Sequence, residues 1–265
     1  MRSSAAEPEV VKTIEIEGDL SGAGLTKLQR EMKEKLDGAR FRQINEQLYK
    51  SESQASHELL RADPKVFEDY HTGFRHQVHS WPTNPVDTYA TLLSSYPPKT
   101  IIADIGCGDA QLAKSLVKEG LNVLSFDLVA SDYVVEADIC RYIPLPGSAP
   151  EGVQTGAAIV DVVVCSLALM GTNWPGCVRE AWRILKDEGE LKIAEVSSRF
   201  TDMKKFIEVI KNVGFKLVSK DDSNTHFLML EFVKDAKKTK LKSEADVVAL
   251  MNRGSLLKAC EYKKR

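Results

Sequence analysis

The sequence predicts an α/β protein built on a doubly wound, mostly parallel sheet of seven strands with helices on both faces. Two observations predict this fold class. An apolar run at residues 101–105 passes through a Gly-x-Gly turn into a helical pattern at 110–117, as in the first unit of such a sheet. Further apolar, β-branched segments then recur along the chain with helical patterns between them.

The first turn carries the strongest chemical signal. Gly106 and Gly108 let the backbone bend sharply and let a ligand lie against bare peptide, beside Cys107. The third glycine of a dinucleotide fingerprint is missing because Gln111 stands there, and Asp109 brings negative charge where a pyrophosphate would lie. A cationic cofactor without phosphate fits better. The turn therefore favours S-adenosyl-L-methionine, which leaves S-adenosyl-L-homocysteine as product, and a Rossmann-like class I methyltransferase fold.

Two later strands end in carboxylates that suit the same cofactor. Asp127 closes the strand at 122–127 and is the predicted ligand of the ribose hydroxyls. Asp138 closes the predicted strand at 134–139, where it could accept from an adenine amino group. A single such carboxylate is more often a turn residue or a helix cap. Acidic residues at successive strand ends favour a shared site.

The second half of the sheet follows from residue 159. We expect strands at 159–166 and 191–196, a closing hairpin at 215–220 and 227–233, and helices at about 174–185 and 202–212. The segments after the fourth and fifth strands lie where such sheets place their chemistry. Met170, Asn173 and Arg199 are therefore the candidates for positioning a flipped or unpaired base, with Arg199 near phosphate or the base edge. A packing role for Met170 is at least as consistent with the sequence.

Composition sets the outer limits. The chain has 265 residues, a net charge of −2 and five cysteines without a Cys-x-x-Cys pair. One core with extensions, a reducing compartment and no structural zinc are expected. No apolar run is long enough to span a bilayer, so we expect a soluble intracellular protein without membrane partners. The charge gives no general attraction to nucleic acid, and any such contact must come from a local patch.

The regions outside the core are expected to divide as follows: a disordered leader at 1–24, a helical cap and cofactor lid at 25–97, the cofactor-binding core at 98–233, and a basic, mobile tail at 234–265. Apolar residues at helical spacing predict two cap helices, interrupted at Gly38. Their charges can form a solvated helix face, but Arg40 and Arg42 are candidates for stacking on RNA bases.

The segment 69–82 is dense in aromatic and imidazole groups. Its histidines lack a nearby Cys or a His-Glu-x-x-His arrangement, so no metal site is expected. We interpret it as an aromatic lid on the sheet. In the functional version of this interpretation, His71 reaches the polar end of the cofactor and Arg75 faces RNA.

With these segments in place, the chain resembles the eukaryotic nucleolar ribosomal RNA-processing methyltransferases, the nucleomethylin-like family. The resemblance runs from about 25 to 233 and recurs at the extreme end. It rests on the stretches 38–49, 70–75, 81–87, 167–173 and 194–200, which are not general to methyltransferases.

The resemblance implies N1-methylation of an adenosine in large-subunit (25S/28S) ribosomal RNA during ribosome biogenesis, in the nucleus and nucleolus, with the rRNA or pre-ribosome as partner. It also implies cofactor contacts at His71, Gly106, Asp127, Asp138, Ile139 and Cys165. Two alternatives stay open. One is a cofactor-binding adaptor in ribosomal-gene silencing or ribosome assembly, with chromatin partners and no methylation. The other is a small-molecule methyltransferase, disfavoured because the cap looks suited to an extended polyanion.

Overall fold

The computed structural model describes residues 25–148 and 156–262. The predicted leader at 1–24 lies outside the described residues. The chain divides into two compact units, Met1–Leu36 and Asp37–Arg265. The second unit contains the whole sheet and is the subject of the following paragraphs.

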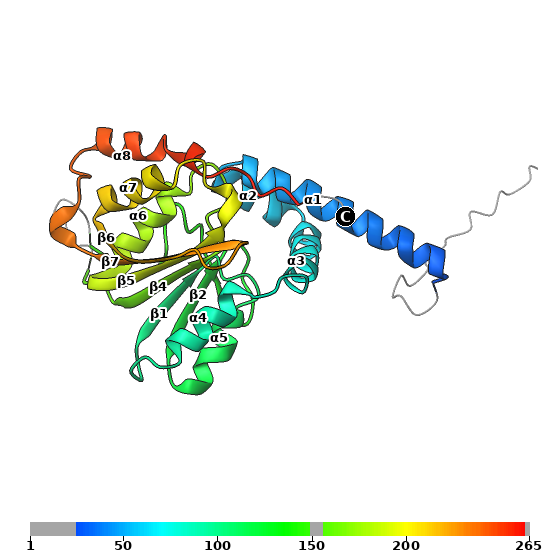
Figure 1. The fold of residues 1–265 in the computed structure, drawn as a ribbon, viewed down its shortest axis with the longest axis horizontal. Helices are drawn as coiled ribbons and strands as arrows, with labels where there is room; N and C mark the ends of the chain where they lie inside the picture. Colours follow the sequence, from blue (N-terminus) through cyan, green and yellow to red (C-terminus); the bar gives the residue numbers. More distant parts are fainter. Residues whose placement is uncertain (1–24, 149–155, 263–265) are drawn as a thin grey trace, which may run out of the picture. The chain divides into compact units, whose positions relative to one another are not determined.

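Seven strands form one sheet in the order β3-β2-β1-β4-β5-β7-β6, and β7 runs opposite to the other six (Figure 1). The predicted fold class is confirmed. The strand order reverses between β1 and β4, and ligands of such sheets bind at the carboxyl ends of the strands beside this point. The strands are β1 (Ile101–Ile105), β2 (Asn122–Asp127), β3 (Val134–Glu136), β4 (Val160–Ser166), β5 (Leu185–Val196), β6 (Phe215–Asp221) and β7 (Phe227–Lys234).

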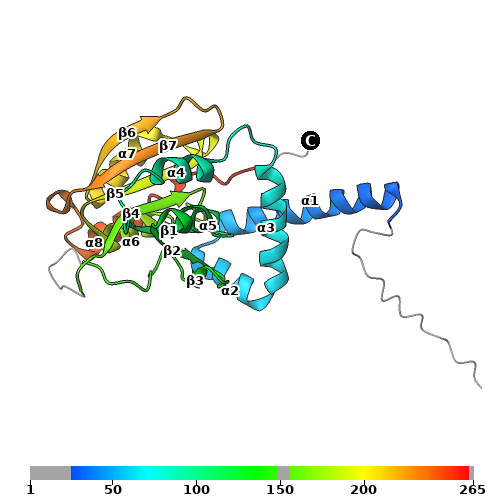
Figure 2. The ribbon, with the colours of Figure 1, turned by 90° about the horizontal axis from the view of Figure 1, so that it is seen from below.

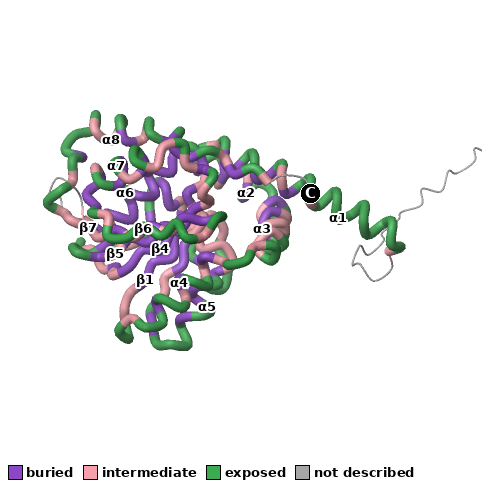
Figure 3. Tube along the Cα trace, viewed as in Figure 1, coloured by how far each residue is buried: buried purple, intermediate pink, exposed green. Residues whose placement is uncertain are grey.

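Helices cover both faces of the sheet (Figures 1 and 2). On one face lie α4 (Pro85–Leu93) and α5 (Gln111–Leu116), whose apolar residues pack on β1 and β4. On the other lie α6 (Pro175–Ile184), α7 (Met203–Val213) and α8 (Glu244–Met251). The central strands β1, β4 and β5 are largely buried between these layers, as the purple segments of Figure 3 show. Burial on both faces explains the near-continuous apolar runs of the central strands.

The helical cap consists of α1 (Lys27–Lys50), α2 (Ser53–Ala62) and α3 (Pro64–Val78). The prediction of a break at Gly38 is wrong, because Gly38 lies inside a continuous helix. From residue 37 onward, α1 contributes Phe41, Ile44 and Leu48 to an apolar cluster shared with α2 and α3. Helix α3 begins at Pro64 because proline suits the first helical position and Asp63 caps the first turn by accepting from the Lys65 amide.

Strand β5 begins at Leu185, earlier than the predicted start at 191, and two further differences concern the site and its support. Strand β3 ends at Glu136, so Asp138 lies in the loop after the strand instead of inside it. The segment after β7 is not a mobile tail, because most of it is folded onto the core through a set of buried side chains: Leu241, Leu250, Leu256, Leu257 and Cys260. Among the described helices, none is long and apolar enough to cross a membrane.

Candidate active site

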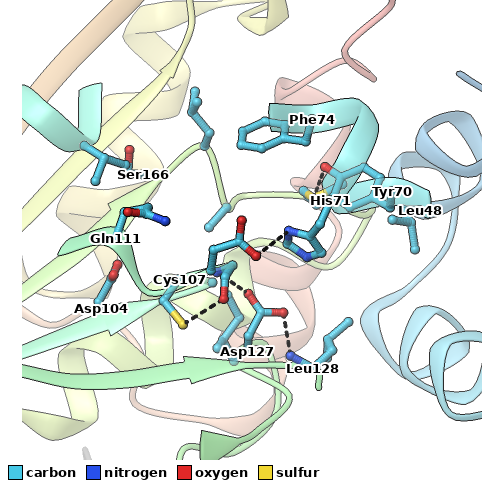
Figure 4. Close-up of a pocket in the computed structure, with 18 of the residues that line it drawn as sticks. Leu48, Tyr70, His71, Phe74, Asp104, Cys107, Gln111, Asp127, Leu128 and Ser166 are labelled. Carbon is cyan, nitrogen blue, oxygen red and sulfur yellow. Dashed lines mark hydrogen bonds and ion pairs between the residues drawn. The ribbon is translucent and has the colours of Figure 1, made fainter. Parts of the chain in front are cut away.

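A cavity of about 450 Å³ opens at the carboxyl ends of β1, β2 and β4, below helices α2 and α3 (Figure 4). Its floor is the glycine turn after β1. Gly106 and Gly108 have φ of 73° and 54°, a region that favours glycine. A Cβ at Gly106 would lie 2.3 Å from the Ala168 Cβ, so a side chain there would collide with the segment after β4.

Asp127 is fixed at the end of β2. One carboxylate oxygen accepts the Gly108 N–H at 2.8 Å, and the other accepts the Leu128 N–H at 2.7 Å (Figure 4). A carboxylate offers about four acceptor positions, so these two bonds leave others available in the cavity. The arrangement suits a ligand with two neighbouring hydroxyl groups.

Asp138 is fixed in a similar way, but from the cap. Its Oδ1 accepts the Cys140 N–H at 3.0 Å, and the Ser53 hydroxyl at the start of α2 donates to its Oδ2 at 2.7 Å. The same hydroxyl accepts from the Asn173 amide at 2.8 Å, and Asn173 Oδ1 accepts the Ser53 N–H. One chain of hydrogen bonds therefore links α2, the loop after β3 and the loop after β4.

A third carboxylate, Asp104, lies deeper in the cavity near Gln111 and Ser166 (Figure 4). Burial, and then the charge of Asp127, raise the pKa of Asp104 to about 7. Among the described residues, no donor bonds to the Asp104 carboxylate, and the buried Ser166 hydroxyl also lacks a partner. The Asp104 carboxylate and the Ser166 hydroxyl could therefore accept hydrogen bonds from a positively charged group of a ligand.

Helix α3 forms one wall of the cavity. His71 is buried at the glycine turn, with Nδ1 4.0 Å from an Asp109 oxygen. Burial lowers the pKa of His71, against the opposing charges of Asp127 and Asp109. Arg75 forms an ion pair with Asp109 at 2.7 Å across the mouth of the cavity. The Tyr70 hydroxyl points to the Met170 sulfur at 3.5 Å, which joins α3 to the loop after β4.

The structure brings most of the predicted site residues together. The cavity is lined by His71, Arg75, Gly106, Cys107, Gly108, Asp127, Asp138, Ile139 and Met170. Their individual roles stay predictions. Cys165 is not among the lining residues, because its side chain points into the core with Sγ 3.9 Å from that of Cys177.

Two predicted substrate-positioning residues need correction. Asn173 does not line the cavity, and its amide is used on Ser53. Arg199 is 1% exposed and donates to the carbonyls of Leu169 and Lys258, so its guanidinium does not reach a phosphate or a base edge. The sequence placed Arg199 correctly at the end of β5, but its neighbours come from distant parts of the chain.

The predicted RNA-contacting arginines of α1 lie outside the cavity. Arg40 is largely exposed and 3.4 Å from Asp69 of α3, and Arg42 is half-buried on the same helix. The sequence predicted that the histidines of the segment 69–82 do not form a metal site. The described residues contain no group of three His, Cys, Asp or Glu side chains that could hold a metal ion.

Sequence reasoning missed Ser53 and did not assign Asp104 a ligand. Ser53 had no signal, since helix α2 was not expected and its partner Asn173 lies 120 residues away. Asp104 had a sequence signal, because it lies in the apolar run of a central strand. A carboxylate buried there has no solvent to stabilise its charge and therefore calls for a partner.

Comparison with known proteins supplies the family. Residues 27–265 match the family described as "Hypothetical methyltransferase". The chain is 40% identical over 260 residues to the 25S rRNA (adenine(645)-N(1))-methyltransferase of Schizosaccharomyces pombe, covering 94% of this chain and 76% of that protein. It is 39% identical over 264 residues to mouse Ribosomal RNA-processing protein 8, covering 100% of this chain and 53% of that protein.

The chain belongs to this methyltransferase family, and ribosomal RNA-processing protein 8 is among its relatives. It spans about half the length of the mouse relative, so it corresponds to one part of that protein. Among solved structures, it is similar to a TehB-like SAM-dependent methyltransferase from Corynebacterium glutamicum, with a TM-score of 0.49, 20% identity and coverage of 65% of this chain and 100% of that one. In this family member, the glycine turn, Asp127 and Asp138 surround one cavity.

Proposed function

We propose that this domain transfers a methyl group from S-adenosylmethionine to N1 of an adenosine in large-subunit ribosomal RNA. The observation that carries the proposal is the cavity in which Asp104, Asp127 and Asp138 lie around a glycine turn, in a chain 40% identical to a relative named for that reaction. Since the relatives are ribosomal RNA-processing proteins, we also propose that it acts in the nucleus, with rRNA or the pre-ribosome as partner.

The residues fit such a cofactor. Asp127 has free acceptor positions for the ribose hydroxyls, and Asp138 beside Ile139 suits the adenine amino group. Asp104 and the unpaired Ser166 hydroxyl suit the ammonium of the amino-acid end. The glycine turn leaves the space that a Cβ at Gly106 would fill. No group in this set would have to leave an existing partner.

When bound, S-adenosylmethionine supplies an electrophilic methyl group on a positively charged sulfur. Adenine N1 has its own lone pair, so the protein needs to align the acceptor and exclude water, with no strong base required. The apolar end of the cavity is formed by Tyr70, Phe74, Ala168 and Met170. These side chains flank the position of the acceptor base and keep it dry.

Adenine N1 lies on the Watson–Crick edge, so the target base must be unpaired or flipped out of a duplex before it can enter the cavity. The protein surface then holds the flanking RNA. Arg40 and Arg42 are the proposed contributors from the cap. Arg75, at the mouth of the cavity, would exchange its Asp109 partner for a phosphate.

The direct test is to incubate the protein with cofactor labelled in the methyl group and with large-subunit rRNA that lacks the modification. We expect label in one adenosine, which arrests reverse transcription because N1-methylation blocks base pairing. Label on another base or on the ribose would contradict the proposed chemistry. Cofactor binding without transfer to any RNA would favour a cofactor-binding adaptor. Transfer to small molecules alone would favour a small-molecule methyltransferase.

A further inference from the structure

One buried ion pair holds both backbone polar groups of a single residue in the loop after β4. Glu195 Oε1 accepts the Leu169 N–H at 3.0 Å, and Arg199 Nη2 donates to the Leu169 carbonyl at 2.7 Å. The two side chains meet through Arg199 Nη1 and Glu195 Oε2 at 2.7 Å, and they are 1% and 0% exposed. We call this arrangement the Leu169 clamp.

The clamped residue lies within a run that lines the cavity: Ser166, Leu167, Ala168, Met170 and Gly171. Beyond Ser166, the last residue of β4, this run has no regular secondary structure to support it. Leu167 has a φ of 58°, a region that L side chains rarely adopt, and Gly171 follows with a φ of 72°. An irregular backbone of this kind keeps its path only where its surroundings fix it.

Arg199 is fixed in turn from the far end of the chain. Its Nε donates to the Lys258 carbonyl at 2.8 Å, and the Lys258 N–H donates to the Arg199 carbonyl at the same distance. The guanidinium also lies over the Tyr49 ring, 4.6 Å from its centre. Asn45 bonds the Cys260 carbonyl at 2.7 Å, which holds the same C-terminal segment on α1.

We propose that Arg199, with Glu195, is a positioning residue for methyl transfer. The Leu169 clamp sets where Ala168 and Met170 stand at the acceptor end of the cavity, and so sets how the base meets the methyl group. The inference rests on the proposed function. Cofactor affinity is separate, since Asp127 is held by Gly108 and Leu128 without any contact to the clamp.

The chain contains a matched control for the same chemistry. Glu180 Oε2 accepts the Ile143 N–H at 2.8 Å, and Arg183 Nη2 donates to the Ile143 carbonyl at 2.6 Å. The pair is joined at 2.7 Å. Ile143 is fully buried and does not line the cavity. We call this the Ile143 clamp; its loss should affect folding without affecting the acceptor end.

The test compares Arg199→Lys with Arg183→Lys. Lysine keeps the charge opposite glutamate, but its single nitrogen cannot also bond two carbonyls at the separate positions that the guanidinium reaches. We expect both variants to melt at lower temperature and both to bind S-adenosylhomocysteine within about threefold of the parent. With RNA and cofactor saturating, Arg199→Lys should lose about 100-fold in kcat, since small misplacements of reacting groups have effects of that order. Arg183→Lys should lose less than about threefold in kcat, because Ile143 does not line the cavity and the reacting groups stay in place.

Equal kcat for the two variants, at equal folded fraction, would overturn the proposal and leave Arg199 a purely structural residue. If Arg199→Lys does not fold, Glu195→Gln against Glu180→Gln makes the same comparison, because glutamine keeps an acceptor for the amide and removes the charge.

A second readout does not depend on activity. The methyl resonance of Met170, labelled with carbon-13 and assigned with Met170→Leu, should shift or broaden in Arg199→Lys and stay in place in Arg183→Lys. An unshifted Met170 signal in both variants would also overturn the proposal. If the parent methylates no RNA while the signal moves as expected, the proposed function fails and the positioning of the loop stands.

Discussion

The two ends of the cavity are built in different ways. At the nucleoside end, Asp127 is held by amides of the glycine turn and of its own next residue, so strand ends and a short turn determine its position. At the acceptor end, Leu169 is held by Glu195 near the end of β5 and by Arg199 just after it, and Arg199 in turn bonds Lys258. The first end depends on local geometry, and the second on contacts between distant segments. Substitutions should therefore separate binding from rate.

The largest effect is expected at the glycine turn. Gly106→Ala places a Cβ 2.3 Å from that of Ala168, in a backbone region with a φ of 73°. The collision should displace the floor of the cavity and abolish measurable cofactor binding in calorimetry. Gly120→Ala is the control, because its φ is 79° and its Cβ would meet nothing within 4 Å. Near-normal binding by Gly106→Ala would show that the turn does not define the nucleoside end.

A smaller loss is expected from Asp127→Ala. Removing two hydrogen bonds from ribose hydroxyls to a carboxylate should cost about 2 to 3 kcal/mol of binding free energy. Asp161→Ala is the control, since Asp161 accepts the Ile101 N–H at the opposite end of the strands and pairs with Lys186. It should lower stability without changing the dissociation constant of the cofactor. Unchanged affinity in Asp127→Ala would remove Asp127 from the site.

Asp104, which we propose to bind the ammonium of the cofactor's amino-acid end, should make cofactor binding depend on pH. The pKa of Asp104 is raised to about 7 in the folded chain from its ordinary value of 3.8, so the folded state holds an extra proton between these values. Stability therefore falls as the pH rises through that window. An ammonium group favours the ionised carboxylate, so cofactor affinity should rise as the pH increases from 6 through about 7. Asp104→Asn should flatten this rise in affinity and stabilise the free protein above pH 7, as followed by calorimetry and thermal melting. A pH profile that persists in Asp104→Asn would assign the dependence to another group.

The same contrast explains what could be predicted from the sequence. The strand–turn–helix unit, Asp127 and Asp138 were predictable because each carboxylate lies at or just after a strand end and accepts an N–H one or two residues further on, from Leu128 and Cys140. Ser53 and the inward direction of Arg199 were not, since their partners Asn173, Leu169 and Lys258 lie 30 to 120 residues away along the chain. An arginine after a strand end is compatible with both a ligand contact and an internal support. Only the arrangement of distant carbonyls decides between them.

The smallest effect is expected on the cap, away from both ends of the cavity. Arg40→Ala with Arg42→Ala should weaken RNA binding and leave cofactor affinity unchanged, because neither residue lines the cavity. The loss should be modest, since Arg40 is already paired with Asp69 and exposed ion pairs exchange partners readily. Each phosphate contact contributes roughly 0.7 to 0.9 to the magnitude of the slope of log K against log salt. If both arginines contact phosphates, that magnitude should therefore decrease by roughly 1.4 to 1.8 in the double variant. Asp69→Asn is the opposite control, as it frees Arg40 and should strengthen binding slightly at low salt. Filter binding across a salt series measures both changes. If the double variant keeps the parent's slope while its melting temperature falls, the two arginines support the cap and the RNA follows another path to the cavity.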